Sequence, residues 1–195
     1  MGKVRPLRVS KPRPLARTLF DALVLVALLA MVGLALRQSG LLPVAPGTYL
    51  AIDGDSLRKD GEDFRLHGID APELHQACQT GNGQIYPCGQ EARNALRRLV
   101  SQQLLDCRMR DVDRYGRSVV TCKAGDLDIN AEMVRLGWAI AYRRHGLGYV
   151  REETTAHVAS RGLWQGRFEN PEAWRARHRG GPVRGSAIPA ATPDG

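Results

Sequence analysis

The sequence of 195 residues lacks three features, and each absence narrows the functions to consider. Its cysteines form no C-x2-C pair, the spacing typical of structural zinc sites, so a zinc centre is not expected. No internal repeat is present. The central part has no excess of positive charge, because the net charge of +8 comes from basic residues before residue 40 and after residue 174. The basic composition is therefore no evidence for a cationic binding surface on the folded part.

One long apolar run is present, over residues 19–36, with Asp21 as its single charged residue. Its length lies within the range of a membrane-spanning helix, and the basic residues before it favour a cytoplasmic N-terminus. We therefore predict a basic cytoplasmic tail at residues 1–17 and a membrane anchor at 18–37. A secretory signal peptide is the alternative, although the run lacks a clear small-x-small cleavage site and meets Arg37 at once. Either interpretation exports the remainder of the chain.

All four cysteines follow this run, so they are expected in an oxidising compartment, where two disulfides can form. Three connectivities are possible, and the sequence alone does not choose between them. We favour Cys78–Cys88, which would close a polar loop, together with Cys107–Cys122. The last two cysteines are equidistant from the tip of an expected hairpin, so they would face each other across two strands.

The remaining pattern alternates short strands with a few helices, which suggests a small, closed β-barrel with helices packed outside it. Asn130 is predicted to be the N-cap of the middle helix. We expect a linker at residues 38–46 and a disordered Gly- and Pro-rich tail at 178–195. The expected strands are 49–53, 56–59, 64–69, 104–112 and 117–124, with a hairpin turn in "KDGED" before the third, and the expected helices are 89–100, 128–137 and 149–162.

Acidic residues at strand ends and turns indicate a possible metal site. Asp55 in "DGDS" and Asp70 in "IDAPE" offer carboxylate oxygens, and the backbone carbonyl of Ala71 offers a third ligand. Calcium binds such oxygen donors. The simpler interpretation is that Asp55 caps a turn.

Two arginines and a glutamate complete the candidate site. Arg65 and Arg117 carry the planar, permanently charged fork that suits a phosphate, and Glu73 could orient or deprotonate a water molecule. Such a set suits a phosphodiester substrate. The simpler alternatives are a surface ion pair between Arg65 and Glu73 and a solvated arginine in the hairpin.

Five segments occur in the order and at about the spacing of the staphylococcal nuclease family: "DGDS", "RLHGIDAPE", "DRYGR", "INAEMVRLGWA" and "ASRGLW". The sequence resembles this family over residues 48–164. The resemblance implies an OB-fold, a five-stranded barrel with about three α-helices, at residues 47–177. It also implies calcium-dependent endonuclease activity that hydrolyses DNA and RNA phosphodiester bonds with low sequence specificity.

The resemblance assigns a role to each candidate residue by its place in these motifs. The implied metal ligands are Asp55, Asp70 and the carbonyl of Ala71, the implied catalytic residues are Arg65, Glu73 and Arg117, and the implied substrate-binding residues are Arg114, Tyr115 and Tyr142. The loop at residues 75–89 departs from the family pattern, because it carries Cys78 and Cys88; a disulfide there would stiffen the surroundings of Glu73.

The expected partners are single-stranded or frayed DNA and RNA, and a membrane through the N-terminal segment; no protein partner is evident. The expected location is the bacterial inner membrane with a single span and the nuclease domain outside the cytoplasm, or secretion after cleavage. Two rival functions remain open: a catalytically inactive OB-fold module that binds nucleic acid or a partner, and a calcium-stabilised structural domain on an exported, polysaccharide- or envelope-related protein.

Overall fold

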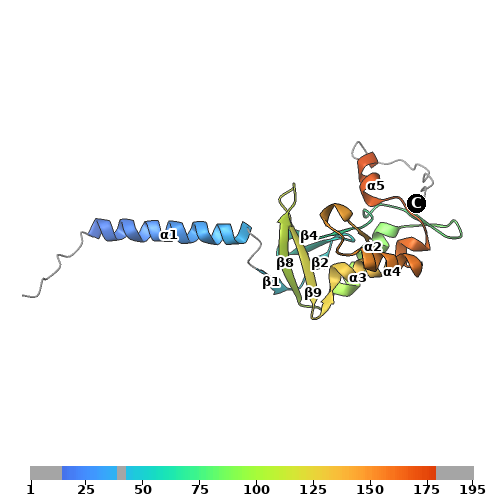
Figure 1. Ribbon diagram of the computed structural model, residues 1–195, viewed down its shortest axis with the longest axis horizontal. Helices are drawn as coiled ribbons and strands as arrows, with labels where there is room; N and C mark the ends of the chain where they lie inside the picture. Colours follow the sequence, from blue (N-terminus) through green and yellow to red (C-terminus); the bar gives the residue numbers. More distant parts are fainter. Residues whose placement is uncertain (1–14, 39–42, 179–195) are drawn as a thin grey trace, which may run out of the picture. The chain divides into compact units, whose positions relative to one another are not determined.

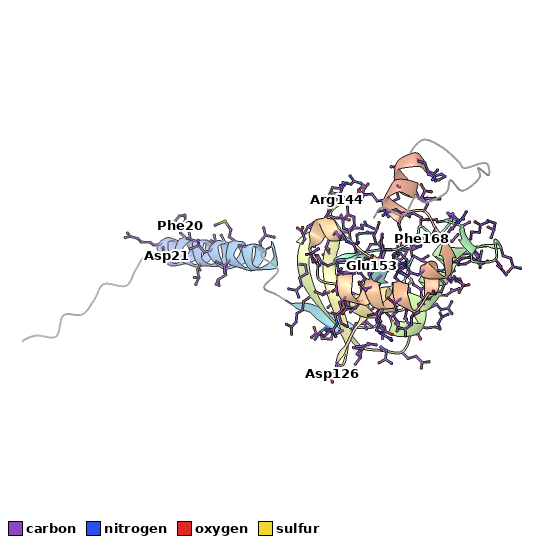
Figure 2. All side chains as sticks on the ribbon, turned by 45° about the vertical axis from the view of Figure 1, so that its right-hand side comes forward. Phe20, Asp21, Asp126, Arg144, Glu153 and Phe168 are labelled. Carbon is purple, nitrogen blue, oxygen red and sulfur yellow. A yellow bond between two sulfur atoms is a disulfide. The ribbon has the colours of Figure 1, made fainter. Side chains whose placement is uncertain are left out.

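The computed structural model describes residues 15–38 and 43–178, which belong to two separate units, Met1–Leu41 and Leu42–Gly195 (Figure 1). In the first unit, residues 18–37 lie within the helix α1 (Leu15–Gln38), from which Phe20 and Asp21 project (Figure 2). Among the residues that the structure describes, no helix has both the length and the apolar character needed to cross a bilayer, so the predicted membrane anchor is not supported. Most of the predicted tails, at residues 1–14 and 179–195, lies outside the described residues.

The second unit is built on a curled sheet in the order β1-β8-β9-β4-β3-β2, with β10 paired to β9. β4 and β9 run parallel, whereas the other neighbouring strands are antiparallel. Register shifts in β1 and β8 mark β-bulges, which increase the local twist. The strands are β1 (Pro43–Gly47), β2 (Leu50–Ala51), β3 (Ser56–Lys59), β4 (Glu62–Leu66), β8 (Leu105–Val112), β9 (Ser118–Ala124) and β10 (Leu127–Asp128).

The prediction of a closed, five-stranded barrel with three helices is wrong in its details. In the described residues the sheet has seven strands and an open path, and the chain has five α-helices. One reason lies at Gly68, whose φ of +75° turns the chain out of β4, so that β5 (Ile69–Asp70) pairs with β11 (Ile140–Ala141) instead of extending the main sheet. The sheet also begins earlier than expected, since residues 43–46 of the predicted linker form most of β1.

Helices cover the sheet and complete the core (Figure 1). The buried face of α2 consists of Ala92, Ala95, Leu96 and Val100 at helical spacing, and it packs into the same core as Leu57, Leu66 and Met133. The helices of this unit are α2 (Cys88–Val100), α3 (Ile129–Arg135), α4 (Val150–Val158) and α5 (Pro171–His178), with single 3-10 turns η1 (Arg143–His145) and η2 (Gly162–Gln165).

Both favoured disulfides are confirmed. Cys107 and Cys122 are paired across β8 and β9, as their equal distance from the hairpin tip predicted, and their Cα atoms are 4.1 Å apart. Cys78 and Cys88 join the start of β6 to the start of α2. They stabilise a small sheet with the order β12-β6-β7, formed by β6 (Cys78–Thr80), β7 (Ile85–Tyr86) and β12 (Gly166–Arg167).

The prediction of Asn130 as a helix N-cap is wrong. Asp128 is the cap of α3, and its carboxylate accepts the N–H of Ala131 at 2.9 Å. Asn130 is fully buried and links three backbone groups of the main sheet and the turn after it: it accepts the N–H of Cys122 at 3.1 Å and donates to the carbonyls of His67 and Val120 at 3.0 and 3.2 Å. A polar residue is tolerated at this depth because its amide is satisfied.

Replacing Asn130 should therefore cost more than removing the cap of the same helix. Asn130→Ala leaves buried backbone groups without partners and should lower the free energy of unfolding by about 2–4 kcal/mol. Asp128→Ala, the matched control, should cost about 1 kcal/mol. Denaturant unfolding of both variants measures the difference, and an equal cost would contradict a linking role for Asn130.

Candidate functional site

Arg65 lies between two buried aspartates. Its NH1 donates to Oδ1 of Asp55 at 2.8 Å, and its NH2 donates to Oδ1 of Asp70 at 2.9 Å. The side chain of Asp70 is 0% exposed and that of Asp55 is 5% exposed. One guanidinium group thus joins two carboxylates that come from different strand ends.

The backbone fixes each of these three residues. Arg65 in β4 is paired with Ser56 in β3, directly after Asp55, and the Leu66 N–H donates to the Asp55 carbonyl at 2.8 Å. The second carboxylate oxygen of Asp55 accepts the N–H of Ala71 at 2.9 Å, so Asp55 also holds the turn that follows Asp70.

Asp70 is placed by the short β5–β11 pair, in which it lies opposite Ile140. The position of β11 depends on α4, because Glu153 accepts the Ala141 N–H at 2.9 Å and pairs with Arg143 at 2.5 Å. Glu153, labelled in Figure 2, belongs to α4, and its side chain is 8% exposed. The acidic residue in α4 therefore stabilises the strand pair that carries Asp70.

The neighbouring carboxylates at this site repel each other electrostatically. Burial, and then the nearby Asp55 charge, raises the pKa of Asp70 to about 6, although Arg175 and Arg65 act in the opposite direction. The charge of Asp55, followed by that of Asp70, raises the pKa of Arg65 above its usual value. Arg65 is therefore a permanent cation, and the carboxylates compete for it.

Glu73 lies one turn beyond Asp70, and its backbone is fixed by Gln76, whose N–H donates to the Glu73 carbonyl at 2.7 Å. The disulfide loop packs against this carbonyl. A Cβ built on Gly89, next to Cys88, would lie only 1.8 Å from the Glu73 oxygen, so only glycine fits there. The expectation that the Cys78–Cys88 loop would stiffen the surroundings of Glu73 agrees with this contact.

Arg175 was not recognised from the sequence. It lies in α5, and its NH1 donates to Oε1 of Glu73 at 2.9 Å, while its NH2 donates to both carboxylate oxygens of Asp70 at 2.9 Å. No motif surrounds it, and a residue more than 100 positions from its partners gives no local signal. Sequence reasoning counted it among the basic residues of the C-terminal end.

Asp53 is the second residue that was missed, although it lies in the same "DGDS" segment. Its Oδ1 accepts the Asp55 N–H at 2.9 Å. Burial, and then the Asp55 charge, raises the pKa of Asp53 to about 6. Its place two residues before Asp55 was the signal that could have identified it.

Arg117 is bonded to Asp113 in this structure and not to Asp55, Asp70 or Glu73. It lies at the end of the hairpin between β8 and β9, where its Nε donates to Oδ2 of Asp113 at 2.7 Å. Oδ1 of Asp113 also accepts the N–H groups of Tyr115 and Arg117, both at 2.9 Å. The guanidinium groups of Arg114 and Arg117 lie over the Tyr115 ring, 4.9 and 5.7 Å from its centre. The hairpin thus forms a separate basic and aromatic group at the surface.

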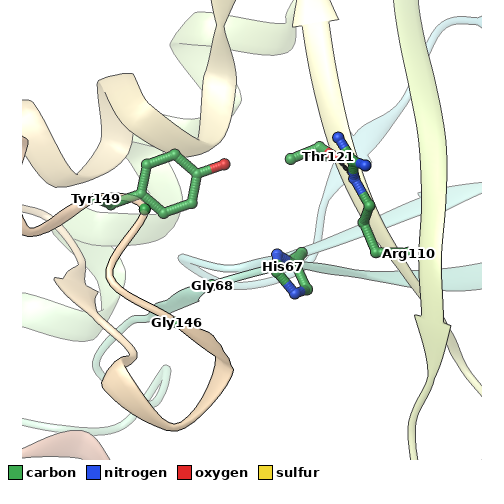
Figure 3. A pocket seen from close by; sticks show the side chains of 7 residues that line it. His67, Gly68, Arg110, Thr121, Gly146 and Tyr149 are labelled. Atoms are coloured by element: carbon green, nitrogen blue, oxygen red, sulfur yellow. Dashed lines mark hydrogen bonds between the residues drawn. The ribbon is translucent and has the colours of Figure 1, made fainter.

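Tyr142 lies just after β11, and its N–H donates to the carbonyl of Gly68 at 2.9 Å. Beside Gly68 is a cavity of about 340 Å³, lined by His67, Arg110, Thr121 and Tyr149 (Figure 3). Figure 3 shows the Tyr149 ring on one side of this cavity and Arg110 and Thr121 on the other. The cavity adjoins the backbone of the predicted nucleotide-binding tyrosine.

The candidate metal ligands provide oxygen atoms only, as calcium requires. In the described residues no group of three or more His, Cys, Asp or Glu side chains could hold a metal ion, so a cation there would depend on Asp55, Asp70, the Ala71 carbonyl and water. Burial, followed by the Asp55 charge, raises the pKa of Asp70, which shows that this position favours added positive charge. The donor set therefore fits calcium in its chemistry, and the assignment of ligands stays a prediction.

The raised pKa of Asp53 predicts how the stability of the metal-free protein depends on pH. The folded-state pKa, about 6, lies above the ordinary value of 3.8, so the folded state holds more protons over this interval and loses stability as the pH rises through it. Asp53→Asn removes that loss and still accepts the Asp55 N–H. In chelator, the variant should match the wild type at pH 3.5 and be more stable by about 1–3 kcal/mol at pH 7.

Urea unfolding of both proteins across this pH range checks the prediction. Asp60→Asn serves as the control, because Asp60 is exposed and is not part of the acidic group. A constant difference between Asp53→Asn and the wild type from pH 3.5 to pH 7 would contradict a charge effect.

Comparison with known proteins identifies the relatives of the chain. The pattern of the family described as "Staphylococcal nuclease homologue" matches residues 63–166. The chain is 34% identical over 132 residues to the succinoglycan biosynthesis protein ExoI of Rhizobium meliloti (strain 1021), covering 66% of this chain and 69% of that protein. It is 34% identical over 119 residues to the probable staphylococcal-like nuclease CAN3 of Oryza sativa subsp. japonica, covering 60% of this chain and 29% of that protein.

The chain is also 31% identical over 118 residues to an uncharacterized endonuclease of Haemophilus influenzae, covering 59% of this chain and 61% of that protein. It therefore spans less than two thirds of the Oryza and Haemophilus relatives, and somewhat more of ExoI. On the extent of the family match and on these identities, the chain belongs to the staphylococcal nuclease homologue family.

Proposed function

We propose that this protein is a calcium-dependent endonuclease that hydrolyses phosphodiester bonds of DNA and RNA with low sequence specificity. The observation that carries the proposal is the joining of Asp55 and Asp70 by Arg65, at 2.8 and 2.9 Å, with Glu73 at the edge of the same group. A structural ion pair needs one carboxylate for one guanidinium. Two buried carboxylates at one position are costly without a second cation. In this structure the second cation is Arg175 from α5, in a position that a metal ion could take, which supports a metal-binding role.

Each residue of the group has a distinct role in this proposal. Asp55, Asp70 and the Ala71 carbonyl would hold the cation, which supplies positive charge at the phosphate and makes a bound water more acidic. Glu73 accepts a proton from the attacking water, and the side chain is 34% exposed, so water can reach it. Arg65 donates to a phosphate oxygen and stabilises the negative charge that develops during the attack.

Arg117 contributes the second guanidinium once substrate is bound. Its pair with Asp113 is partly exposed, and pairs of this kind contribute at most about 1 kcal/mol, so a phosphate can compete for the guanidinium at little cost. Arg114 lies beside it and adds charge for a neighbouring phosphate. The hairpin thus presents cations to a nucleic-acid backbone, which favours affinity without reading the sequence.

Base stacking supports a preference for single-stranded or frayed substrate. The Tyr115 ring is exposed at the hairpin tip, and the backbone N–H of Tyr142 donates to the carbonyl of Gly68, one of the residues that line the cavity of about 340 Å³. Aromatic rings stack on any base, so they bind single strands with little sequence preference. We assign Arg114, Tyr115 and Tyr142 to substrate binding on this basis.

We also propose that the nuclease domain lies outside the cytoplasm. The support comes from its two disulfides, Cys78–Cys88 and Cys107–Cys122, with no free cysteine among the described residues. Disulfides of this kind persist in oxidising compartments.

A second function is favoured by one observation, the similarity to ExoI, whose name places that protein in succinoglycan biosynthesis. On this alternative the acidic group binds a cation only to stabilise a domain involved in polysaccharide production. Such a domain would need the carboxylates, but neither Arg65 nor Arg117 would contact a phosphate. The two functions therefore differ in whether Arg65 and Arg117 contact a phosphate and are needed for activity.

Cleavage of a labelled single-stranded oligonucleotide separates them. With Ca²⁺ the full-length protein should cut the substrate, and excess chelator should abolish the cutting. Arg65→Ala and Arg117→Ala should each lower the rate by roughly 10²–10³, the usual loss when one preorganised donor to a developing charge is removed.

Arg58→Ala is the matched control, because Arg58 is an exposed arginine in the neighbouring strand β3 that pairs with Asp63, away from the acidic group. Circular dichroism must show that all variants are folded. An unchanged rate in a folded Arg65→Ala or Arg117→Ala variant would remove that arginine from the reaction, and no cleavage by the wild type would favour the polysaccharide-related alternative.

A further inference from the structure

Arg175 holds the same carboxylate that the proposed cation needs. Oδ2 of Asp70 accepts from Arg175, while Oδ1 accepts from both Arg65 and Arg175. All three contacts are 2.9 Å. The carboxylate is therefore filled on both oxygens by guanidinium groups.

A divalent cation and this guanidinium cannot occupy Asp70 together at low cost. Calcium binds carboxylate oxygens at about 2.3–2.6 Å, close to where the Arg175 nitrogen now lies. Two positive groups at one carboxylate repel each other, and the repulsion is strong in a buried position, since the Asp70 side chain is 0% exposed. Binding of the cation to Asp70 therefore requires one of the two arginines, Arg65 or Arg175, to leave the carboxylate.

The position of each arginine decides which one leaves. Arg65 lies in the interior of β4, where its backbone pairs with β3 and β9. Arg175 lies in α5, a short helix at the C-terminal end of the described chain, in which Pro171 is the only buried residue (Figure 1). An element with so little buried surface opens easily.

The same guanidinium also holds Glu73, since NH1 of Arg175 donates to Oε1 at 2.9 Å. Withdrawal of Arg175 would free a carboxylate for the cation and release the base. A single side chain therefore controls two of the groups that the reaction requires.

We propose that Arg175 is a resident counter-ion that closes the site in the metal-free protein, and that calcium binds Asp70 by displacing Arg175 and loosening α5. This inference rests on the proposed calcium-dependent function. In the metal-free state the site is occupied and Glu73 is held; with calcium, α5 is detached from Asp70.

Calcium titration by calorimetry of the full-length, disulfide-intact protein tests the competition without measuring activity. Arg175→Gln should bind Ca²⁺ at least about tenfold more tightly than the wild type, because the cation no longer breaks charge-assisted hydrogen bonds. Arg177→Gln is the matched control: it removes the same charge two residues later in α5, from an arginine that pairs with Glu169 instead, and its affinity should stay within about twofold of the wild type.

Hydrogen exchange distinguishes displacement from a general effect of charge. In the wild type, Ca²⁺ should accelerate exchange of the backbone amides of residues 171–178, whereas in Arg175→Gln exchange there should already be fast and insensitive to Ca²⁺. Equal affinity in Arg175→Gln and wild type, or slower exchange of α5 with Ca²⁺, would overturn the displacement while leaving calcium-dependent cleavage intact. Absence of Ca²⁺ binding in both proteins would overturn the displacement and the calcium dependence together.

Discussion

The structure of the site depends on the sharing of one guanidinium, that of Arg65, between the carboxylates of Asp55 and Asp70. Buried carboxylates repel each other and lose hydration, so they cannot be brought together without a cation. Arg65 meets this need from within the sheet, and it does so with both of its terminal nitrogens. Much of the surrounding architecture, including the β3–β4 hairpin, the β5–β11 pair and the turn at Ala71, serves to hold these three side chains in register.

Two kinds of prediction from the sequence succeeded for clear physical reasons. The disulfide pairing was accessible because Cys107 and Cys122 lie at equal distances from a turn, and antiparallel strands bring such positions together. The convergence of Asp55, Arg65, Asp70 and Glu73 could be predicted because they lie within a stretch of 19 residues that contains the β3–β4 hairpin. Local patterns of this kind determine which side chains meet.

Other features could not be predicted, because they depend on contacts between distant segments. The sheet is open because the chain turns at Gly68 and β5 pairs with β11, a strand about 70 positions later in the sequence. Asn130 has the sequence context of a cap, yet the burial of α3 against β9 makes it an internal link and leaves the cap to Asp128. Arg175 reaches the site through the docking of α5. The hairpin places Arg117 next to Asp113, four residues before it. Asp113 therefore binds the Arg117 guanidinium that was expected at Asp55 and Asp70.

The two cations at Asp70 differ in how their backbones are held, and this difference gives them different functions. Arg65 lies in a central strand, and its backbone is fixed by pairing with β3 and β9, so it can leave the carboxylates only by rotating its side chain. Arg175 lies in the last helix that the structure describes, which has one buried residue, and on this basis we propose that it exchanges with a competing cation. The family pattern, which matches residues 63–166, includes Arg65 but ends before Arg175. Arg65 thus lies within the part of the chain that the family pattern covers, whereas Arg175, the arginine that we propose to be exchangeable, lies beyond it.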